Sequence, residues 1–164
     1  MIKQSNDICV DIPGGMFNYR VGAIILHNGY LLMAKDNNNP IYYTVGGRVQ
    51  FRESSRDAVV RETFEETGVQ LTIDRLVVIH ENFFTWEPED KPFHEICFYY
   101  LMKPHNGLDK IQKSFTEYNI EMGLYWLPVD KLSQYPMYPV FLPEEVKNPS
   151  PVVKQITTQD DVII

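Results

Sequence analysis

One stretch of this sequence, from Ser54 to Gly68, has a clear helical period, whereas the other apolar segments are short. Ser54 or Ser55 is a typical N-cap residue, and Gly68 suits the position just after the last helical turn. A rotation of about 100° per residue places five apolar or β-branched residues on one arc: Val59, Val60, Thr63, Phe64 and Thr67. Since such an arc has to be buried, we expect the helix to pack on a sheet.

The remaining apolar segments predict the strands of that sheet. The first two, 20–26 and 30–34, are separated by His27-Asn28-Gly29, which is typical of the tight turn of a hairpin. The third, 41–45, runs into Gly46-Gly47, where the backbone can bend sharply and approach another group closely. The other strands are expected at 71–84, 94–102 and 124–127.

Two segments are rich in prolines and are not expected to contain long regular elements. Thr85 to Phe93 is polar and contains prolines, which predicts a loop between two strands, long enough to bind a ligand. Tyr135 to Pro151 contains Pro136, Pro139, Pro143, Pro149 and Pro151, so no long helix can run through it. Residues 144–147 could still form a turn or two, and Pro128 could start a short helix.

The size and charge of the chain limit its class. With 164 residues it corresponds to about one domain, and we treat 1–164 as a single domain. Its 15 Lys and Arg against 22 Asp and Glu give a formal net charge of -7, which argues against binding to polymeric nucleic acid or to anionic membranes. Two cysteines without metal-ligand spacing and the absence of a signal peptide or a membrane-spanning run predict a cytoplasmic protein.

Three glutamates share one face of the expected helix. Glu62, Glu65 and Glu66 stand at i, i+3 and i+4, where like charges repel, and the last helical turn already disfavours anions. Arg61 alone cannot neutralise all three. A solvated charged face is the ordinary alternative for an acidic helix. A divalent cation explains the cluster better, and the spacing predicts a site for Mg²⁺ or Mn²⁺.

The residues just before the helix strengthen this prediction. The strand that ends at Gly46-Gly47 leaves backbone carbonyls and amides accessible to a metal ion or a phosphate. Glu53 lies immediately before the helix and can turn back toward the same place. Alone, two glycines indicate an ordinary turn, but in combination with the helix they indicate part of a site.

These residues together resemble a known motif. Gly47, Glu53, the Arg61-Glu62 pair, Glu65-Glu66 and Gly68 stand at the spacing of the Nudix box of Nudix (MutT-like) hydrolases. Every fixed glycine, arginine and glutamate of that motif is present. The departures are Thr63 in place of a bulky aliphatic residue, Val45 in place of a frequent proline and Arg52 in place of a frequent glycine.

The resemblance covers about residues 17–133, and the Pro-rich segment 134–164 lies beyond it. It implies an α/β fold, an α/β/α sandwich around a central mixed β-sheet, with the box as a loop-helix-loop. It also implies an Mg²⁺-dependent, or Mn²⁺-dependent, hydrolase that cleaves the pyrophosphate linkage of a nucleoside diphosphate derivative. The substrate would be a nucleotide sugar such as ADP-ribose, or a nucleoside triphosphate.

The resemblance also implies roles for the residues of the box. Glu62, Glu65 and Glu66 would be metal ligands, the carbonyl of Gly46 would join them, and Glu53 would bind a second ion directly or through water. Arg61 would orient the carboxylates. The general base is left open between Glu62 and Glu121, which stands in the segment leading to the last strand.

Residues outside the box are candidates for substrate binding. The guanidinium groups of Arg20, Arg48 and Arg52 suit phosphate oxygens. Among the aromatic residues that could stack on a base, Trp86 is preferred because its segment is polar and contains prolines. The others are Phe17, Tyr19, Phe84 and Phe93.

Two other functions compete with the enzyme. One is a non-catalytic Nudix-like domain that binds a nucleotide or metabolite as a regulator. The other is a calcium-binding or structural acidic domain, which lacks the support of an EF-hand pattern. The intact glutamates favour the enzyme, because a pure binding module has no need of them all. A homodimer is the default assembly.

Overall fold

The computed structural model describes residues 6–36, 39–87, 89–111, 114–115 and 121–164, with only the backbone described for 114–115 and 121–122. The strands are β1 (Cys9–Ile12), β2 (Gly15–Ile24), β3 (Leu26–His27), β4 (Tyr30–Asp36), β5 (Tyr42–Arg48), β6 (Ile73–Trp86), β7 (Lys91–Met102), β8 (Ser114–Phe115), β9 (Glu121–Pro128), β10 (Met137–Tyr138), β11 (Lys154–Gln159) and β12 (Val162–Ile163). The α-helices are α1 (Ser55–Thr67) and α2 (Leu142–Lys147), and the 3-10 helices are η1 (Asn106–Lys110) and η2 (Val129–Gln134).

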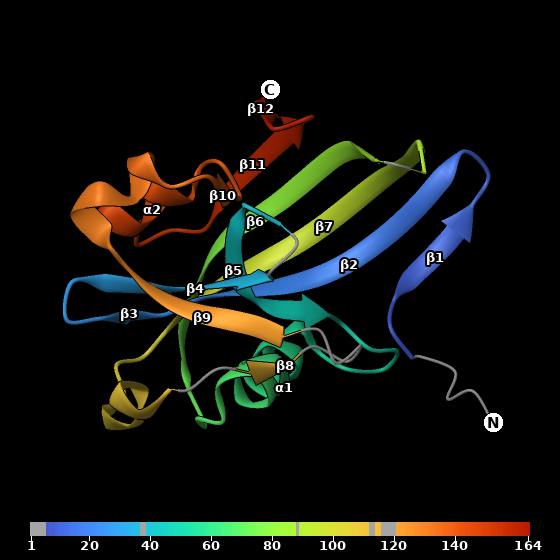
Figure 1. The fold of residues 1–164 in the computed structure, drawn as a ribbon. Coiled ribbons are helices and arrows are strands. Elements are labelled where there is room, and N and C mark those ends of the chain that lie inside the picture. The colour runs from blue at the N-terminus through green and yellow to red at the C-terminus, as the bar shows by residue number, and fades with distance from the viewer. Residues whose placement is uncertain (1–5, 37–38, 88, 112–113, 116–120) are drawn as a thin grey trace.

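The strands form one mixed, curved sheet (Figure 1). Their order is β12-β11-β6-β7-β2-β5-β4-β9-β8, with β1 beside β2, β3 beside β4 and β10 beside β5. Three pairs are parallel, β11 with β6, β2 with β7 and β10 with β5, and the others are antiparallel. The sheet is therefore mixed, as predicted.

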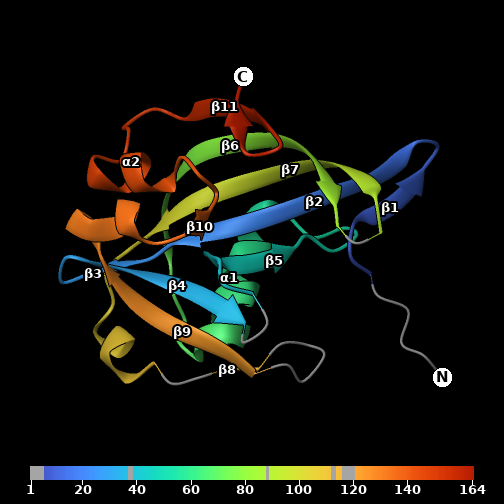
Figure 2. The ribbon, with the colours of Figure 1, turned by 45° about the horizontal axis from the view of Figure 1, so that its top comes forward.

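Helices cover both faces of the sheet. Helix α1 packs on one face, while α2, η2 and β10 lie on the other (Figure 2). One buried apolar cluster fills the space between α1 and the sheet, and it includes Val21, Val45, Val59 and Tyr100. The opposite side is filled by a second cluster, which includes Val78, Tyr99, Leu132 and Leu142. This arrangement confirms the predicted α/β/α sandwich.

Helix α1 begins and ends where the sequence predicts. The side chain of Ser54 accepts a hydrogen bond from the backbone N–H of Asp57 at 3.1 Å, which caps the first turn. Gly68 has a φ of 70°, and its N–H donates to the carbonyl of Phe64 at 2.8 Å.

The predicted buried arc of α1 is only partly correct. Val59, Thr63 and Thr67 are buried, but Phe64 is 49% exposed. The helix is rotated about its axis, so that Ala58 is also buried and Glu62 and Glu66 lie at the edge facing the sheet. The reason is that the carboxylates turn toward Gly46 and Gly47, as described below.

One predicted strand and one predicted loop differ from the structure. The strand expected at 20–26 is interrupted at Ile25, so the hairpin at Asn28-Gly29 joins β3 to β4, and β2 instead pairs with β5 and β7. The long loop predicted at 85–93 is wrong, because Thr85 pairs with Pro92 and Trp86 with Lys91. Cross-strand pairing extends both strands to a short turn despite the prolines and polar residues.

The Pro-rich C-terminal segment is part of the sheet. Residues 144–147 belong to α2, as expected, but β10 also pairs with β5, and β11 pairs with β6 over six residues. Thus the segment beyond residue 133 contributes to both the sheet and its cover. In the part of the chain that the structure describes, no helix is long and apolar enough to cross a membrane.

Candidate active site

Arg61 lies at the centre of a group of carboxylates at the end of β5 and along α1. Its Nε and Nη2 donate to the two oxygens of Glu53 at 2.8 and 2.9 Å, a bidentate pair. Its Nη1 donates to Glu62 at 2.7 Å and to Glu65 at 3.2 Å. Nη2 also donates to the backbone carbonyl of Arg48 at 3.0 Å, which ties the helix to the end of β5.

Glu53 holds the segment before α1 in place. Besides its pair with Arg61, its Oε2 accepts a hydrogen bond from the backbone N–H of Gln50 at 3.0 Å. The hydrogen bonds from Arg61 hold the pKa of Glu53 below its ordinary value, so this carboxylate is ionised. Its side chain is 16% exposed, close to the 15% of Glu62.

Gly47 provides the room that the carboxylate of Glu62 occupies. A Cβ at position 47 would collide with the carboxyl carbon and both oxygens of Glu62. Burial raises the pKa of Glu62, and the hydrogen bond from Arg61 opposes this rise. The glycine therefore lets a carboxylate approach the backbone of β5.

Glu66 is the one glutamate of α1 that Arg61 does not contact. Its Oε1 accepts a long hydrogen bond, 3.4 Å, from the N–H of Gly46, and its Oε2 is buried with no hydrogen-bond partner among the described residues. Burial, and then the charge of Glu62, raises the pKa of Glu66 to about 8. A buried, unpaired carboxylate is costly unless a cation compensates it.

The carboxylates around Arg61 differ in how well they could bind a divalent cation. Within the described ranges, no three His, Cys, Asp or Glu side chains converge on one point, because Arg61 stands among Glu53, Glu62 and Glu65. However, Glu62 and Glu66 are adjacent carboxylates with raised pKa values, and one oxygen of Glu66 lacks a partner. This set of hard oxygen donors fits Mg²⁺ or Mn²⁺.

The predicted phosphate-binding arginines lie in different places. Arg20 on β2 is opposite Arg48 on β5, on the sheet face away from α1. Arg48 donates from Nε to Asn18 at 3.1 Å, whereas the guanidinium of Arg20 interacts electrostatically with the carboxylate of Glu95 on β7. Arg52 is exposed in the turn before α1, with a φ of 68° that favours glycine.

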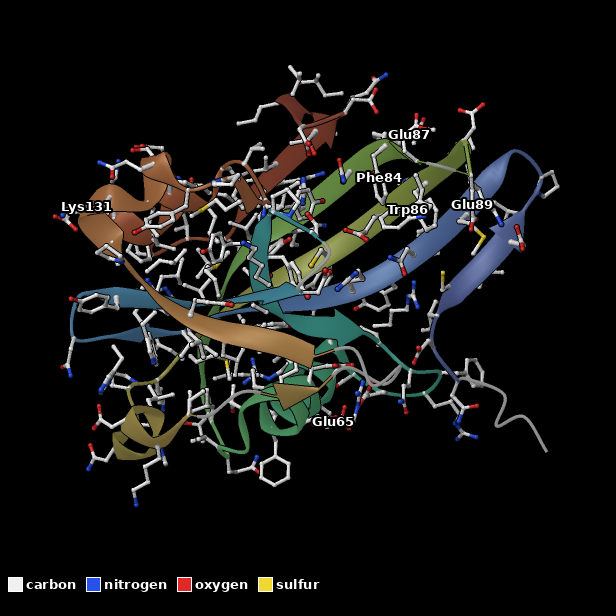
Figure 3. All side chains as sticks on the ribbon, in the orientation of Figure 1. Glu65, Phe84, Trp86, Glu87, Glu89 and Lys131 are labelled. Atoms are coloured by element: carbon white, nitrogen blue, oxygen red, sulfur yellow. The ribbon has the colours of Figure 1, made fainter. Side chains whose placement is uncertain are left out.

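Trp86 is not brought near the glutamates. It is the last residue of β6 and is 53% exposed, and Figure 3 shows it at the far end of the β6–β7 hairpin, away from Glu65 on α1. The other aromatic candidates are engaged with neighbouring rings: Phe84 with Phe93 at 5.0 Å, Phe17 with His94 at 5.8 Å and Tyr19 with Phe98 at 5.6 Å.

Glu121 is the first residue of β9, where its backbone pairs with Phe115. Its side chain lies outside the described residues, so its role as a general base stays a prediction.

Sequence analysis missed a group of polar residues on the face away from α1. Asn18, Asn82 and Glu95 lie side by side on β2, β6 and β7 and are almost fully buried. No local signal marked them, because each stands in a strand that carries other polar residues as well.

Comparison with known proteins identifies relatives of the chain. The family model described as "NUDIX domain" matches residues 16–146. A MutT-like protein of Streptomyces ambofaciens is 23% identical over 113 residues, which cover 69% of this chain and 64% of that protein. The CTP pyrophosphohydrolase of Escherichia coli K12 is 27% identical over 127 residues, which cover 75% of this chain and 84% of the relative.

Solved structures share the fold. A MutT protein from Bacillus halodurans has a TM-score of 0.61 at 17% identity and covers 90% of this chain and 94% of its own. An ADP-ribose pyrophosphatase from Streptococcus suis has a TM-score of 0.55 at 17% identity, with 86% of this chain and 98% of that chain covered. At these identities the likeness concerns the fold alone.

The close approach of the Glu62 carboxylate to Gly47 gives a first prediction. In Gly47→Ala the new methyl group displaces the mobile end of Glu62, so Mn²⁺ affinity measured by electron paramagnetic resonance should fall about 10–100-fold. Because only a flexible side chain has to move, the melting temperature should fall by no more than about 3 °C. Gly46→Ala is the contrast, since its Cβ would collide with the backbone of Val21 and the fold should suffer. Unchanged Mn²⁺ affinity in Gly47→Ala would exclude Glu62 as a ligand.

The burial of Glu66 gives a second prediction. Its pKa is about 8 in the folded chain against an ordinary value of 4.5, so the folded state binds more protons between these values. The stability of the metal-free protein should therefore decline as the pH rises through this window. Melting curves in EDTA should show a weaker decline for Glu66→Gln than for the wild type. Equal slopes in the two proteins would contradict the burial of an unpaired carboxylate.

Proposed function

The chain belongs to the NUDIX domain family and is a hydrolase of that family, and from this premise we propose that it cleaves the pyrophosphate linkage of a nucleoside diphosphate derivative with the aid of Mg²⁺. The observation that carries the proposal is the buried oxygen of Glu66 without a partner, beside Glu62 and the Gly46-Gly47 backbone.

In this proposal Glu62, Glu66 and the carbonyl of Gly46 hold the cation, and Glu65 and Glu53 support further coordination. A bound divalent cation would shield the phosphate oxygens and lower the pKa of a bound water. Arg61 positions the carboxylates, because its guanidinium already contacts three of them. The general base is Glu62 or Glu121.

Arg20 is the proposed phosphate ligand outside the box. Its charge interacts with Glu95 and also acts on both Glu62 and Glu66, so it lies within electrostatic reach of the glutamates of α1. A cation in this place attracts an anionic substrate to an otherwise acidic protein. Arg48 and Arg52 remain secondary candidates, since Arg48 is already bound to Asn18.

The names of the relatives suggest two substrate classes, nucleoside triphosphates and nucleotide sugars. One relative is named a CTP pyrophosphohydrolase, and one structural neighbour is named an ADP-ribose pyrophosphatase. Both classes contain the linkage that we propose is cleaved. The cytoplasmic location and the homodimer stay predictions.

A panel of nucleoside triphosphates and nucleotide sugars tests the proposal. With Mg²⁺ or Mn²⁺ the protein should release a nucleoside monophosphate from at least one compound, and EDTA should abolish the release. Glu66→Gln should lower kcat/KM at least about 100-fold, because the cation loses a charged ligand. Binding of nucleotides without any turnover would favour the regulatory domain instead.

Removal of the Arg20 charge tests its role in phosphate binding. Arg20→Gln should raise KM for the best substrate about 10–100-fold, the effect of one lost charge-assisted hydrogen bond. Arg56→Gln is the matched control, because Arg56 is exposed on the first turn of α1. Steady-state kinetics decide the matter, and equal KM values for the two variants would remove Arg20 from the substrate site.

A further inference from the structure

A chain of buried hydrogen bonds crosses the sheet face away from α1 and ends at Tyr138 on β10. Thr158 donates from Oγ1 to Asn82 Oδ1 at 2.6 Å, and Asn82 donates from Nδ2 to the hydroxyl of Tyr138 at 2.7 Å. His80 Nε2 lies 2.7 Å from Thr158 Oγ1 and must donate to it, because the single proton of Thr158 goes to Asn82. The directions of all three hydrogen bonds are thus fixed.

The direction of this chain leaves one donor unused. The hydroxyl of Tyr138 accepts from Asn82, so its own proton is available, and it has no acceptor among the described residues. Burial raises the pKa of Tyr138, and the charge of Glu95 raises it further, so the hydroxyl stays protonated. Tyr138 therefore offers a fixed hydrogen-bond donor.

A fixed acceptor lies beside it. Glu95 on β7 is 5% exposed and stands opposite Asn82 in the β6–β7 register. Its Oε2 accepts from Asn18 Nδ2 at 2.7 Å, and Asn18 in turn accepts from Arg48 Nε at 3.1 Å. The other oxygen, Oε1, accepts no hydrogen bond from the described residues, and the charge of Arg20 acts on the same carboxylate. Glu95 is thus held in one orientation with an acceptor left over.

These two groups and Arg20 come from strands that are far apart in sequence. Tyr138 is bound to Asn82, which stands opposite Glu95 in the β6–β7 register, so its hydroxyl lies close to Glu95. Arg20 lies two residues beyond Asn18 on β2, and Asn18 also stands opposite Glu95. The charge of Arg20 acts on Tyr138 as well as on Glu66, which connects this place with the glutamates of α1. A substrate whose phosphates lie at Arg20 would extend its other end toward Glu95 and Tyr138.

The charge of Glu95 restricts what that end can be. A carboxylate only accepts hydrogen bonds and repels phosphate or carboxylate groups, so it requires a neutral group with N–H donors. The adjacent hydroxyl of Tyr138 requires an acceptor. Nucleobases with an exocyclic amino group next to a ring nitrogen or carbonyl have this pattern, and carboxylates read the amino group of cytosine in this way.

We propose that Glu95 and Tyr138 bind the base of the nucleotide substrate and select bases that carry an exocyclic amino group, an inference that rests on the proposed function. Glu95 Oε1 accepts from the amino group, and the hydroxyl of Tyr138 donates to the neighbouring acceptor of the base. A carbonyl in place of the amino group faces the carboxylate and is rejected.

Two ligand pairs test this selection, because each pair differs by an amino group against a carbonyl: CTP with UTP, and ATP with ITP. Affinities are measured with non-hydrolysable α,β-methylene analogues, and kcat/KM is measured with the triphosphates. The wild type should prefer the amino member of at least one pair by about 10–100-fold. Glu95→Gln should reduce this preference to about threefold or less, since its amide can rotate to donate to a carbonyl.

Control variants separate selection from loss of structure. Glu89→Gln makes the same chemical change at an exposed residue at the end of the β6–β7 hairpin and should keep the wild-type preference (Figure 3). Tyr138→Phe should weaken binding of both members of a pair. The melting curve of Glu95→Gln shows whether this variant is folded. A preference that Glu95→Gln retains, or a wild type without any preference, would overturn the inference.

The failure of this inference differs from the failure of the proposed function. Hydrolysis without base preference leaves the hydrolase and removes the role of Glu95. Selective binding of the analogues without hydrolysis of any triphosphate supports the base site and contradicts the activity. No binding of any of the four nucleotides overturns the base site.

Discussion

The bidentate pair between Arg61 and Glu53 is the contact on which the rest of the site depends. It joins the segment before α1 to the second turn of that helix, and the bond from Arg61 to the carbonyl of Arg48 joins both to β5. Because α1 is fixed in this way, Glu62 and Glu66 face the glycines at positions 46 and 47. Because α1 lies close to the end of β5, the carboxylates of this helix and of the segment before it are brought together.

This set is not electrically balanced by the protein. Arg61 contacts Glu53, Glu62 and Glu65, whereas Glu66 receives only a long bond from a backbone N–H. Burial of a carboxylate without a partner has a free-energy cost that a bound cation would offset. In the proposed function, the imbalance that weakens the metal-free protein favours binding of Mg²⁺, and the cation would allow an acidic chain to bind a phosphate.

Local signals predicted α1, its caps and the glutamate group, because these depend on residues within one or two turns of each other. Pairing between distant segments could not be predicted in the same way. Thr85 and Pro92 look like loop residues but pair across the β6–β7 hairpin, and the Pro-rich segment contributes β10 and β11. The polar group around Glu95 was missed for the same reason, since it forms only when β2, β6 and β7 assemble.

The central claim is that Glu62, Glu66 and the carbonyl of Gly46 hold a divalent cation. Crystals grown with Mn²⁺ and measured at the manganese absorption edge test it most directly, because the anomalous signal locates the ion independently of activity. The account predicts a peak in contact with the carboxylates of Glu62 and Glu66 and with the carbonyl of Gly46, at the oxygen distances typical of such ions. An anomalous map with no peak at these residues, or with the ion bound only elsewhere, would contradict it.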